Sequence, residues 1–427
     1  MIATIREILR FLGEPTVTLF GILLAYFWIV WGIKFICSRF YRPVRNEFTA
    51  LVSVIIPTYH EDEKVLEEVI NRVLQYPAEK VPEVLIITDQ REENVAQTLQ
   101  LRYTNEPRIR VISASPGKRA AIDIGIRSAS NEILVVIESD TFVNEQTISE
   151  LIKPFADTRV GGVVGDQRIY KPYDILVNFF NTLAEGIKYA ITIPALSVFG
   201  KVTVLGGRCV AYRKSAVLPL LPDLVNEKFL GPPNFQKRQC ISGDDGRITS
   251  LLLQAGWRTH YQSTAVVYTV SPPTWSELAR QRLRWHRNSC RRTSRALLRD
   301  KLWAWRQPVV ALQMLSTWTG TLMMCLVVYV VVNSMISTSW FWFGTTWEGT
   351  FARIGVLVGG TTLTRVIRIH PILRYHSTRK WIYFPLFPWY LIAMWGIRLY
   401  AIATMNKQGW VTRQTNGGGG FNSNRTR

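Results

Sequence analysis

The stretch Ile133-Leu134-Val135-Val136-Ile137-Glu138-Ser139-Asp140 decides the fold class, because a short apolar run ends directly in two acidic side chains. Five consecutive branched apolar residues are typical of a strand that is buried on both faces. Three similar runs precede it and alternate with stretches of helical periodicity. The predicted strands are 52–57, 84–88, 109–113 and 133–137, and the predicted helices are 61–75, 91–103 and 118–129. This alternation predicts an α/β fold with a doubly wound, mostly parallel sheet.

Acidic side chains follow two of these strands. Asp89 comes after the second strand, and Glu138 and Asp140 come after the fourth. Ligands of parallel α/β sheets bind at the carboxyl ends of the strands, so these positions predict a site. Glu138 and Asp140 are suited to share a divalent cation with a diphosphate. Asp89 is suited to accept hydrogen bonds from a base or ribose, and its alternative role is the N-cap of helix 91–103.

A second pair of acids, Asp244 and Asp245, follows Gly243 and precedes a helical stretch at 246–255. Two adjacent carboxylates are costly unless one is protonated or paired. Near a metal and a guanidinium, one of them would keep a pKa suited to taking a proton from a hydroxyl group. An N-cap role explains one of the two aspartates but not easily both.

The stretch Gln281-Arg282-Leu283-Arg284-Trp285 carries the third group of candidates. On a helix, Gln281, Arg284 and Trp285 fall at i, i+3 and i+4 and share one face. The guanidinium suits a diphosphate, the indole suits a sugar ring, and the amide would orient either. The alternative is an Arg/Trp pair that packs at a membrane surface. Lys118, at the start of a predicted helix, adds a cation for a phosphate or a base.

The composition favours an anionic partner. The chain has 427 residues, a net charge of +20, 48% hydrophobic residues and 15 tryptophans. The basic residues cluster around apolar segments, which favours membrane lipids and makes nucleic acid the least expected partner. The five cysteines show no C-x-x-C pairing and the five histidines no H-E-x-x-H motif. Any metal site would therefore use oxygen ligands.

Several apolar segments predict a membrane protein. Residues 17–37 are long enough to cross a bilayer, and the basic residues after them place the following domain in the cytoplasm. Three more apolar segments, 308–336, 350–368 and 381–404, follow residue 300. The first is a predicted span, the second carries arginines, and the third contains prolines.

Three helical segments are assigned to the membrane surface. Residues 1–13 are predicted to form an amphipathic helix. Residues 173–200 are apolar and aromatic, which favours an interfacial helix, with a core helix as the alternative. Residues 274–299 carry many arginines and a single acid, Glu277, and are expected to lie on anionic headgroups.

The motifs together resemble those of processive family-2 glycosyltransferases, a group that includes hyaluronan, chitin, nodulation-type chito-oligosaccharide and cellulose synthases. Asp89, the Glu138-Ser139-Asp140 triplet, Gly243-Asp244-Asp245 and Gln281–Trp285 follow in the order typical of that family. The resemblance covers about residues 50–300 and a distal segment, Gly409-Trp410-Val411-Thr412-Arg413, which is similar to the gating segment of these synthases.

The resemblance implies a role for each matching residue. Asp89 and Lys118 would hold the uridine end of a UDP-sugar, Asp140 would bind Mg²⁺ or Mn²⁺, and Asp245 would be the catalytic base. The acceptor would contact Asp244, Gln281 and Trp285, and the nucleotide sugar would contact Arg284, Trp410, Thr412 and Arg413. Three positions depart from the family pattern: Glu138 replaces an aspartate, Gly246 precedes Arg247, and Arg208 replaces a small residue. The role of Glu138 as a metal ligand is therefore in doubt.

The resemblance divides the chain into five parts: an anchor at 1–48, a cytosolic GT-A-like glycosyltransferase domain at 49–270, interfacial helices at 271–306, a transmembrane region at 307–405, and a gating-like segment with a disordered tail at 406–427. It implies a multi-pass plasma-membrane enzyme that polymerises UDP-sugars and exports the product. Arginines in apolar segments favour a polyanion such as hyaluronan, with chitin, cellulose or another neutral β-glycan next. A non-processive sugar transferase and a nucleotide-binding transport or scaffold protein are the rival interpretations.

Overall fold

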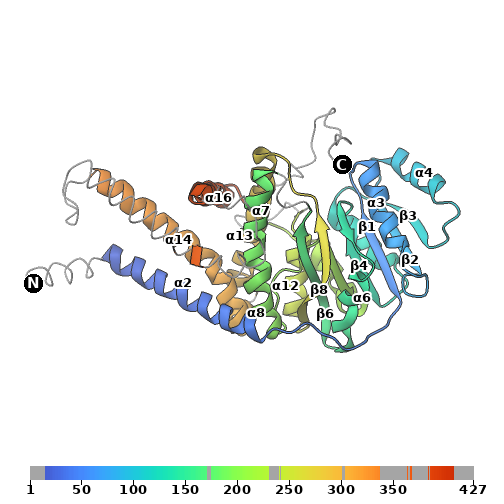
Figure 1. The fold of residues 1–427 in the computed structure, drawn as a ribbon, viewed down its shortest axis with the longest axis horizontal. Helices are drawn as coiled ribbons and strands as arrows, with labels where there is room; N and C mark the ends of the chain where they lie inside the picture. Colours follow the sequence, from blue (N-terminus) through green and yellow to red (C-terminus); the bar gives the residue numbers. More distant parts are fainter. Residues whose placement is uncertain are drawn as a thin grey trace, which may run out of the picture.

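A mixed sheet forms the framework of the right-hand half of the molecule in Figure 1. The computed structural model describes residues 15–170, 175–229, 240, 242–300, 303–336 and 385–407, with 363, 366, 367 and 383. Within these residues the sheet has eight strands in the order β3-β2-β1-β4-β7-β6-β8-β5. The strands are β1 (Val52–Pro57), β2 (Glu83–Asp89), β3 (Ile109–Ala114), β4 (Ile133–Ile137), β5 (Thr141–Val143), β6 (Val160–Ile169), β7 (Cys209–Arg213) and β8 (Arg258–Thr269). The four predicted strands are confirmed.

The strand pairing follows the predicted class. β1 runs parallel to β2 and β4, β2 runs parallel to β3, and β6 runs parallel to β8. β7 runs antiparallel to β4 and β6, and the short β5 runs antiparallel to β8. Every residue of β2 and β4 is buried, because helices cover both faces of the sheet here and no side chain can face water.

Two layers of helices cover the sheet. One layer packs in the core that includes Val54, Ile56 and Val135, and the other packs in the core that includes Ile55, Leu85 and Val136. The first layer comprises α3 (Glu63–Leu74), α4 (Glu93–Arg102), α6 (Thr147–Ile152) and η1 (Lys153–Ala156). The second comprises α5 (Lys118–Ser128), α8 (Ile193–Val198), α9 (Lys214–Val217), η3 (Leu218–Leu220), α10 (Leu221–Val225) and α12 (Asp244–Gln254). The predicted helices after the first three strands are confirmed as α3, α4 and α5.

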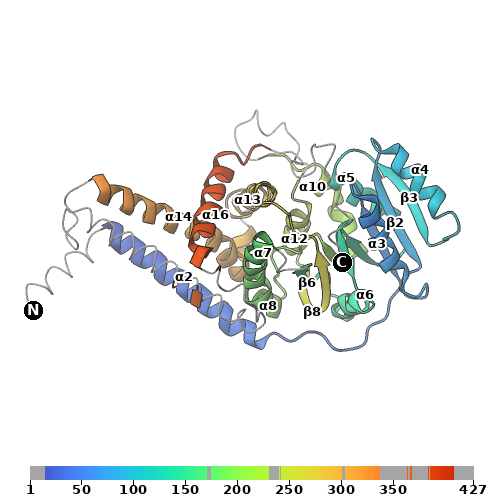
Figure 2. The same ribbon diagram turned by 45° about the horizontal axis from the view of Figure 1, so that its top comes forward.

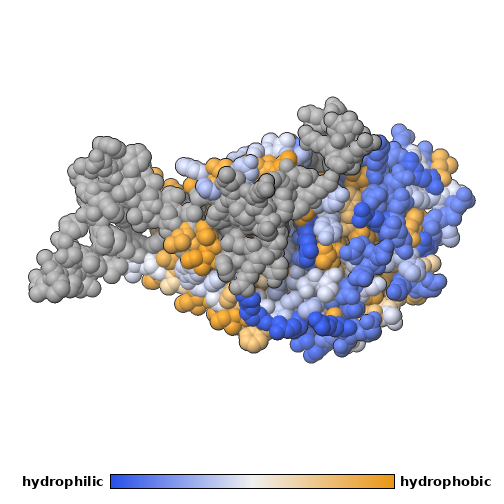
Figure 3. Space-filling model, in the orientation of Figure 1, coloured by the Kyte–Doolittle hydropathy of each residue, from blue (hydrophilic) through white to orange (hydrophobic). Residues whose placement is uncertain are grey.

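Two long apolar helices extend away from the sheet. They are α2 (Pro15–Phe40) and α14 (Pro308–Ile336), and both are long and apolar enough to cross a membrane. Figures 1 and 2 both show them side by side. In Figure 3, hydrophobic patches gather over the α2 and α8 side, and the hydrophilic surface gathers over α3 and α4. The predicted helix 1–13 and most of the segment 350–368 lie outside the described residues.

The third predicted C-terminal segment forms α16 (Phe387–Ala403), which is shorter than the two long helices. It is seen nearly end-on in Figure 1, whereas α2 and α14 lie close to the plane of the picture, so it runs across them. Its Phe387 and Tyr390 pack in one core with Phe180 and Leu278. Phe180 stacks on both rings, with centroids 6.1 Å and 5.2 Å away.

The interfacial assignment of residues 173–200 is wrong. This segment forms α7 (Leu176–Ile187), a π-helical turn η2 (Lys188–Thr192) and α8, and most of its side chains are buried. Phe179 and Phe180 pack against α13 and α16, while Tyr189 and Ile193 pack against the sheet. The alternative interpretation, a core helix, is therefore the correct one. The segment is apolar because it lies between two protein cores.

The basic helix is confirmed as α13 (Trp275–Leu298), and its expected position on lipid headgroups stays a prediction. Most of its arginines bind protein groups. The contacts are Arg282 with Glu185, Arg287 with Thr404, Arg291 with the carbonyl of Met405, Arg292 with the carbonyl of Thr203, and Arg295 with Glu227. Two of these partners, Glu185 and Glu227, are acids far away in the sequence, and the other three are neutral oxygen atoms. Sequence periodicity gives no sign of any of them.

A close approach of β6 and β8 provides a test of the fold. A Cβ atom on Gly165 would lie 2.4 Å from the carbonyl oxygen of Ala265, at a register shift between the two strands. Because a backbone atom cannot move aside, we expect Gly165→Ala to destabilise the domain by about 1–3 kcal/mol. Thermal unfolding of the full chain in detergent measures the effect. Gly396→Ala is the control, since nothing lies within 4 Å of its Cβ, and equal loss in both variants would contradict this account.

Candidate active site

A cleft of about 700 Å³ lies at the carboxyl ends of β1, β2 and β4. Its lining combines residues of these strand ends with residues of α5, α7, α12 and α13. Of the residues predicted for the site, the cleft brings together Asp89, Lys118, Glu138, Asp140, Asp244, Asp245, Gln281, Arg284 and Trp285. Trp410, Thr412 and Arg413 lie outside the described residues, so their assignment stays a prediction.

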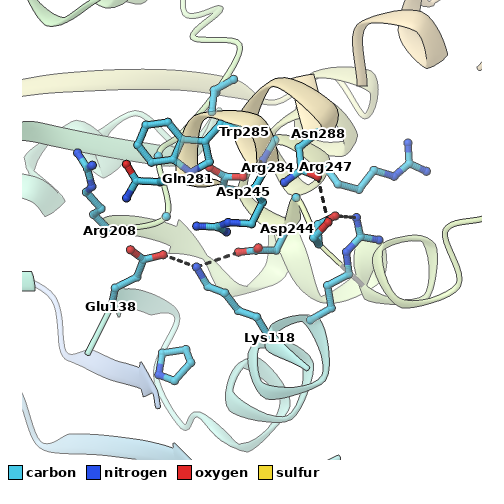
Figure 4. Close-up of a pocket in the computed structure, with 18 of the residues that line it drawn as sticks. Lys118, Glu138, Arg208, Asp244, Asp245, Arg247, Gln281, Arg284, Trp285 and Asn288 are labelled. Atoms are coloured by element: carbon cyan, nitrogen blue, oxygen red, sulfur yellow. Dashed lines mark hydrogen bonds and ion pairs between the residues drawn. The ribbon is translucent and has the colours of Figure 1, made fainter. Parts of the chain in front are cut away.

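The acid pair begins helix α12. Gly243 is the N-cap residue, with a φ of +80° in the left-handed region, and Asp244 and Asp245 form the first helical turn. A side chain at Gly243 would also meet Asn288 of α13 at 3.0 Å, so glycine allows the two helices to approach closely here. The backbone N–H of Gly246 donates to Asp245 at 2.7 Å. Neither aspartate is the N-cap, and both side chains are left for the cleft (Figure 4).

The surroundings of Asp245 favour its protonated form. Removal from bulk water raises the pKa of this carboxyl, and the adjacent charge of Asp244 raises it further. The ammonium of Lys118 and the N–H of Gly246 act in the opposite direction, but the net effect on the pKa is upward. A carboxylate with a raised pKa is a stronger proton acceptor than an exposed aspartate, as a general base requires.

Lys118 lies between the two groups of acids (Figure 4). Its Nζ forms an ion pair with Glu138 and lies 3.4 Å from Asp244. Burial alone would lower the pKa of Lys118, but Asp244 and Glu138 raise it well above its ordinary value. For Glu138 the directions are reversed: burial alone would raise its pKa, but Lys118 lowers the pKa to about 2. Gly207 leaves the space for this contact, because a Cβ there would lie 3.2 Å from Nζ.

Helix α13 forms another wall of the cleft. The residues predicted to share one face of this helix, Gln281, Arg284 and Trp285, all line the cleft. The Nε of Arg284 and the Oε1 of Gln281 are buried, and neither has a hydrogen-bonding partner among the residues that the structure describes. Both side chains line the cleft, so a ligand would satisfy them. The indole of Trp285 contacts two guanidinium groups, with Arg282 4.8 Å and Arg208 5.5 Å from the ring centroid.

Asp89 lines the cleft at the carboxyl end of β2. Its carboxylate accepts two hydrogen bonds from the Arg91 guanidinium, both at 2.7 Å, and these hold the pKa of Asp89 below its usual value. Arg91 in turn lies 4.8 Å from the ring of Tyr59, which also lines the cleft. The alternative N-cap role is wrong, because helix α4 begins at Glu93 with Glu92 as its N-cap residue.

The family of the chain follows from a comparison with known proteins. A family model described as "Glycosyltransferase like family 2" matches residues 49–288, which is more than half of the chain. The chain belongs to this family. It is a sugar-transferring enzyme, and the cleft is the candidate active site of a glycosyltransferase.

Two curated relatives match most of this glycosyltransferase. It is 27% identical to an N-acetylglucosaminyltransferase of Azorhizobium caulinodans over 377 residues, which cover 86% of this chain and 88% of the relative. It is 26% identical to an N-acetylglucosaminyltransferase of Rhizobium meliloti over 378 residues, which cover 87% and 83%. Among solved structures, a mannosyltransferase of Pyrobaculum calidifontis in complex with GDP-mannose and Mn²⁺ is similar, with a TM-score of 0.58 and 17% identity over 90% of this chain and 96% of that one. This likeness confirms the GT-A-like fold.

The donor atoms of the cleft suit a hard divalent cation only in part. Asp140 and Glu138 both line the cleft and supply carboxylate oxygens. Glu138, however, already binds Lys118. Within the described residues, no three His, Cys, Asp or Glu side chains are arranged to hold a metal ion. The protein therefore offers few ligands, and a bound diphosphate and water would supply the others.

Sequence reasoning missed the ion pairs that hold the site together. Glu227 binds three arginines, Arg119 of α5, Arg247 of α12 and Arg295 of α13, at 2.6 Å, 3.3 Å and 3.1 Å. It thus connects the three helices that carry Lys118, the acid pair and Arg284. An isolated glutamate beside a proline-rich stretch has no recognisable pattern in the sequence, so no motif would have revealed this role.

The charges around Asp245 predict how its pH dependence should change. Asp244→Asn removes a negative charge, so the pKa of Asp245 should fall and the acidic limb of the pH–kcat/KM profile should move to lower pH. Lys118→Gln removes a positive charge, so the limb should move to higher pH. Sugar transfer by the purified enzyme across the acidic and neutral range measures both shifts. Shifts in one common direction, or no shift in either, would show that another group controls the limb.

Proposed function

We propose that this glycosyltransferase adds N-acetylglucosamine from UDP-N-acetylglucosamine to the end of a growing β-linked glycan, with inversion at the anomeric carbon and repeated addition before release. The observation that carries the proposal is the placement of Asp245, Arg284 and Trp285 around one cleft. They supply, in turn, a proton acceptor of raised pKa, a guanidinium whose Nε is buried and unsatisfied, and an aromatic surface.

Each of these groups has a place in a single displacement. Asp245 takes the proton of the acceptor hydroxyl, whose oxygen forms a bond to the anomeric carbon. The bond from that carbon to the diphosphate breaks at the same time, and UDP leaves with the electron pair. Arg284 stabilises the charge that develops on the diphosphate. Because the attacking and leaving oxygens lie on opposite sides of the carbon, the configuration inverts.

A divalent cation belongs to the proposal as well. Asp140 would hold Mg²⁺ or Mn²⁺ together with the diphosphate, and Glu138 would join only if Lys118 released it. The cation would supply further charge stabilisation on the leaving diphosphate. The similar mannosyltransferase structure is a complex with Mn²⁺ and a nucleotide sugar, which supports this assignment.

The choice of sugar rests on the relatives, both of which are named N-acetylglucosaminyltransferases. Hyaluronan, the first expectation from the sequence, depended on arginines that would line a path for a polyanion. Arg398 instead donates to the backbone carbonyl of Thr317 in α14, where it joins two helices. Arg353, Arg365 and Arg368 lie outside the described residues. A homopolymer of N-acetylglucosamine is therefore proposed ahead of hyaluronan, cellulose or another β-glycan.

We also place the enzyme in the plasma membrane as a multi-pass protein with a cytoplasmic catalytic domain. α2 and α14 are the candidate spans among the described residues, and the basic residues after α2 set the orientation. α14 packs directly on the catalytic domain, because Val310 and Met314 share a core with Leu253 of α12 and Leu297 of α13. The helix that carries the acid pair is thus anchored beside a membrane span, which favours export of the chain from the site of its synthesis.

The donor test separates the candidate polymers. We expect purified full-length protein to release UDP and form a chitinase-sensitive product from UDP-N-acetylglucosamine alone, with products longer than one added sugar. Addition of UDP-glucuronate should not change the rate. A product that forms only with both donors and is cleaved by hyaluronidase would establish hyaluronan instead, and a single added sugar would establish a non-processive transferase.

The base is tested by Asp245→Asn. The amide keeps the size of the side chain but cannot accept the proton, so we expect sugar transfer to fall by at least about a hundredfold. UDP binding, measured by calorimetry, should be retained because Arg284 and Asp89 are unchanged. Sugar transfer by Asp245→Asn at a large fraction of the parent rate would show that Asp245 is not the base. If the protein only binds nucleotide without turnover, parent and variant should behave alike.

A further inference from the structure

Helix α7 carries a row of polar side chains through an otherwise apolar region. Asn178, Asn181, Thr182 and Glu185 are all at least nine-tenths buried, in a helix whose other residues include Phe179, Phe180 and Leu183 in an aromatic core. A carboxylate in such a place is costly unless it is paired. The pairing of Glu185 therefore indicates what the polar row is for.

Glu185 holds the guanidinium of Arg282. Its Oε1 accepts a hydrogen bond from Nη1 of Arg282 at 2.9 Å, and the side chain of Asn181 accepts one from Nη2. The amide of Asn181 then donates to the hydroxyl of Ser271 at 2.8 Å. Two buried acceptors one helical turn apart on α7 thus bind both ends of the guanidinium and fix its plane.

The guanidinium of Arg282 lies against the indole of Trp285, the predicted contact for the acceptor sugar. The Cζ atom of Arg282 is 4.8 Å from the centroid of the Trp285 ring, within the range of a cation–π contact. The Arg208 guanidinium contacts the same ring at 5.5 Å. Arg282 points toward α7, whereas Gln281, Arg284 and Trp285 line the cleft, so Arg282 connects the polar row to the site.

The local backbone also changes next to Glu185. The regular α-helix ends at Ile187, and the chain continues as the π-helical turn from Lys188 to Thr192. Such turns are rare and occur mostly at functional sites. Here Lys188 lies 3.9 Å from Glu185, and both residues line the cleft. The α7 helix is therefore a wall of the cleft on the side of Trp285.

We propose that Glu185 is a positioning residue for the acceptor: through Arg282 it holds the indole of Trp285 in the orientation that receives the terminal sugar of the glycan chain. This inference rests on the proposed function, since it assumes a sugar acceptor at Trp285. It assigns to α7 a role in acceptor binding that is separate from donor binding, because Asp89, at the end of β2, is held by Arg91 and not by the Glu185–Arg282 pair.

The test compares Glu185→Gln with a matched control. Glu83→Gln also weakens the ion pair of a buried glutamate, here with the half-exposed Arg110 at 2.8 Å, but at the start of β2, away from the cleft. Initial rates of the full-length enzyme are measured with UDP-N-acetylglucosamine and a chito-oligosaccharide acceptor, each varied in turn. We expect Glu185→Gln to raise the acceptor KM by roughly tenfold and to leave the donor KM within about twofold of the parent. Glu83→Gln should change neither KM.

A double-mutant cycle tests whether Glu185 acts through Arg282. Arg282→Lys loses the planar contact with Trp285 and should raise the acceptor KM by a similar factor. The double variant Glu185→Gln/Arg282→Lys should be little worse than either single variant, since the two residues serve one function. Independent, multiplying effects would show that Glu185 contacts the acceptor directly and would overturn the proposal.

The remaining outcomes are distinguishable. An unchanged acceptor KM in Glu185→Gln, or equal rises in the donor KM and the acceptor KM, would overturn the role of Glu185 while the proposed function stands. A parent enzyme that transfers no sugar from UDP-N-acetylglucosamine to the oligosaccharide would overturn the proposed function itself, and the positioning role with it.

Discussion

Three of the carboxylates that line the cleft, those of Glu138, Asp244 and Asp245, lie near the ammonium group of Lys118, which allows them to coexist there. Glu138 comes from the end of β4 and Asp244 from the start of α12, and Lys118 pairs with both. Without this cation, mutual repulsion and the loss of hydration would force protonation of more than one acid. With it, Glu138 stays ionised, whereas the pKa of Asp245 is raised. The division of roles among the acids therefore depends on one lysine at the start of α5.

The remainder of the fold brings these charged groups together. The sheet positions Asp89 and Glu138 at the carboxyl ends of β2 and β4, on either side of β1, and α13 contributes Arg284 and Trp285 to the same cleft. Glu227 links α5, α12 and α13 by ion pairs with three arginines. The same α13 packs on α16 and α14, so the wall of the active site is continuous with the helices proposed to meet the membrane. In the proposed function, the synthesis of the glycan chain and its export would therefore both involve α13.

The first half of the fold was predictable residue by residue. The parallel strands β1, β2 and β4 are buried on both faces and have nearly continuous apolar runs, and the helices that connect the first four strands have clear periodicity. The second half was not, because its strands include β6, in which Gly161, Gly162 and Gly165 interrupt the apolar pattern. Residues 173–200 were expected to form a helix at the membrane surface, whereas α7 and α8 are buried within the protein. An apolar helix between two protein cores and an apolar helix on a bilayer have the same sequence pattern, and a basic helix looks alike whether its counter-charges are lipids or distant glutamates.

The sequence by itself determined the class of the sheet, the acids at the strand ends, the acid pair, the polar face of α13 and the family, because each depends on residues close together in the chain. Only the tertiary structure decided which charges neutralise one another. The pairs Lys118–Glu138, Arg282–Glu185 and Arg119–Glu227 join residues 20, 97 and 108 positions apart. Electrostatic energy depends on distance and burial in space, and no local pattern records which of several acids will lie within about 3 Å of a given cation.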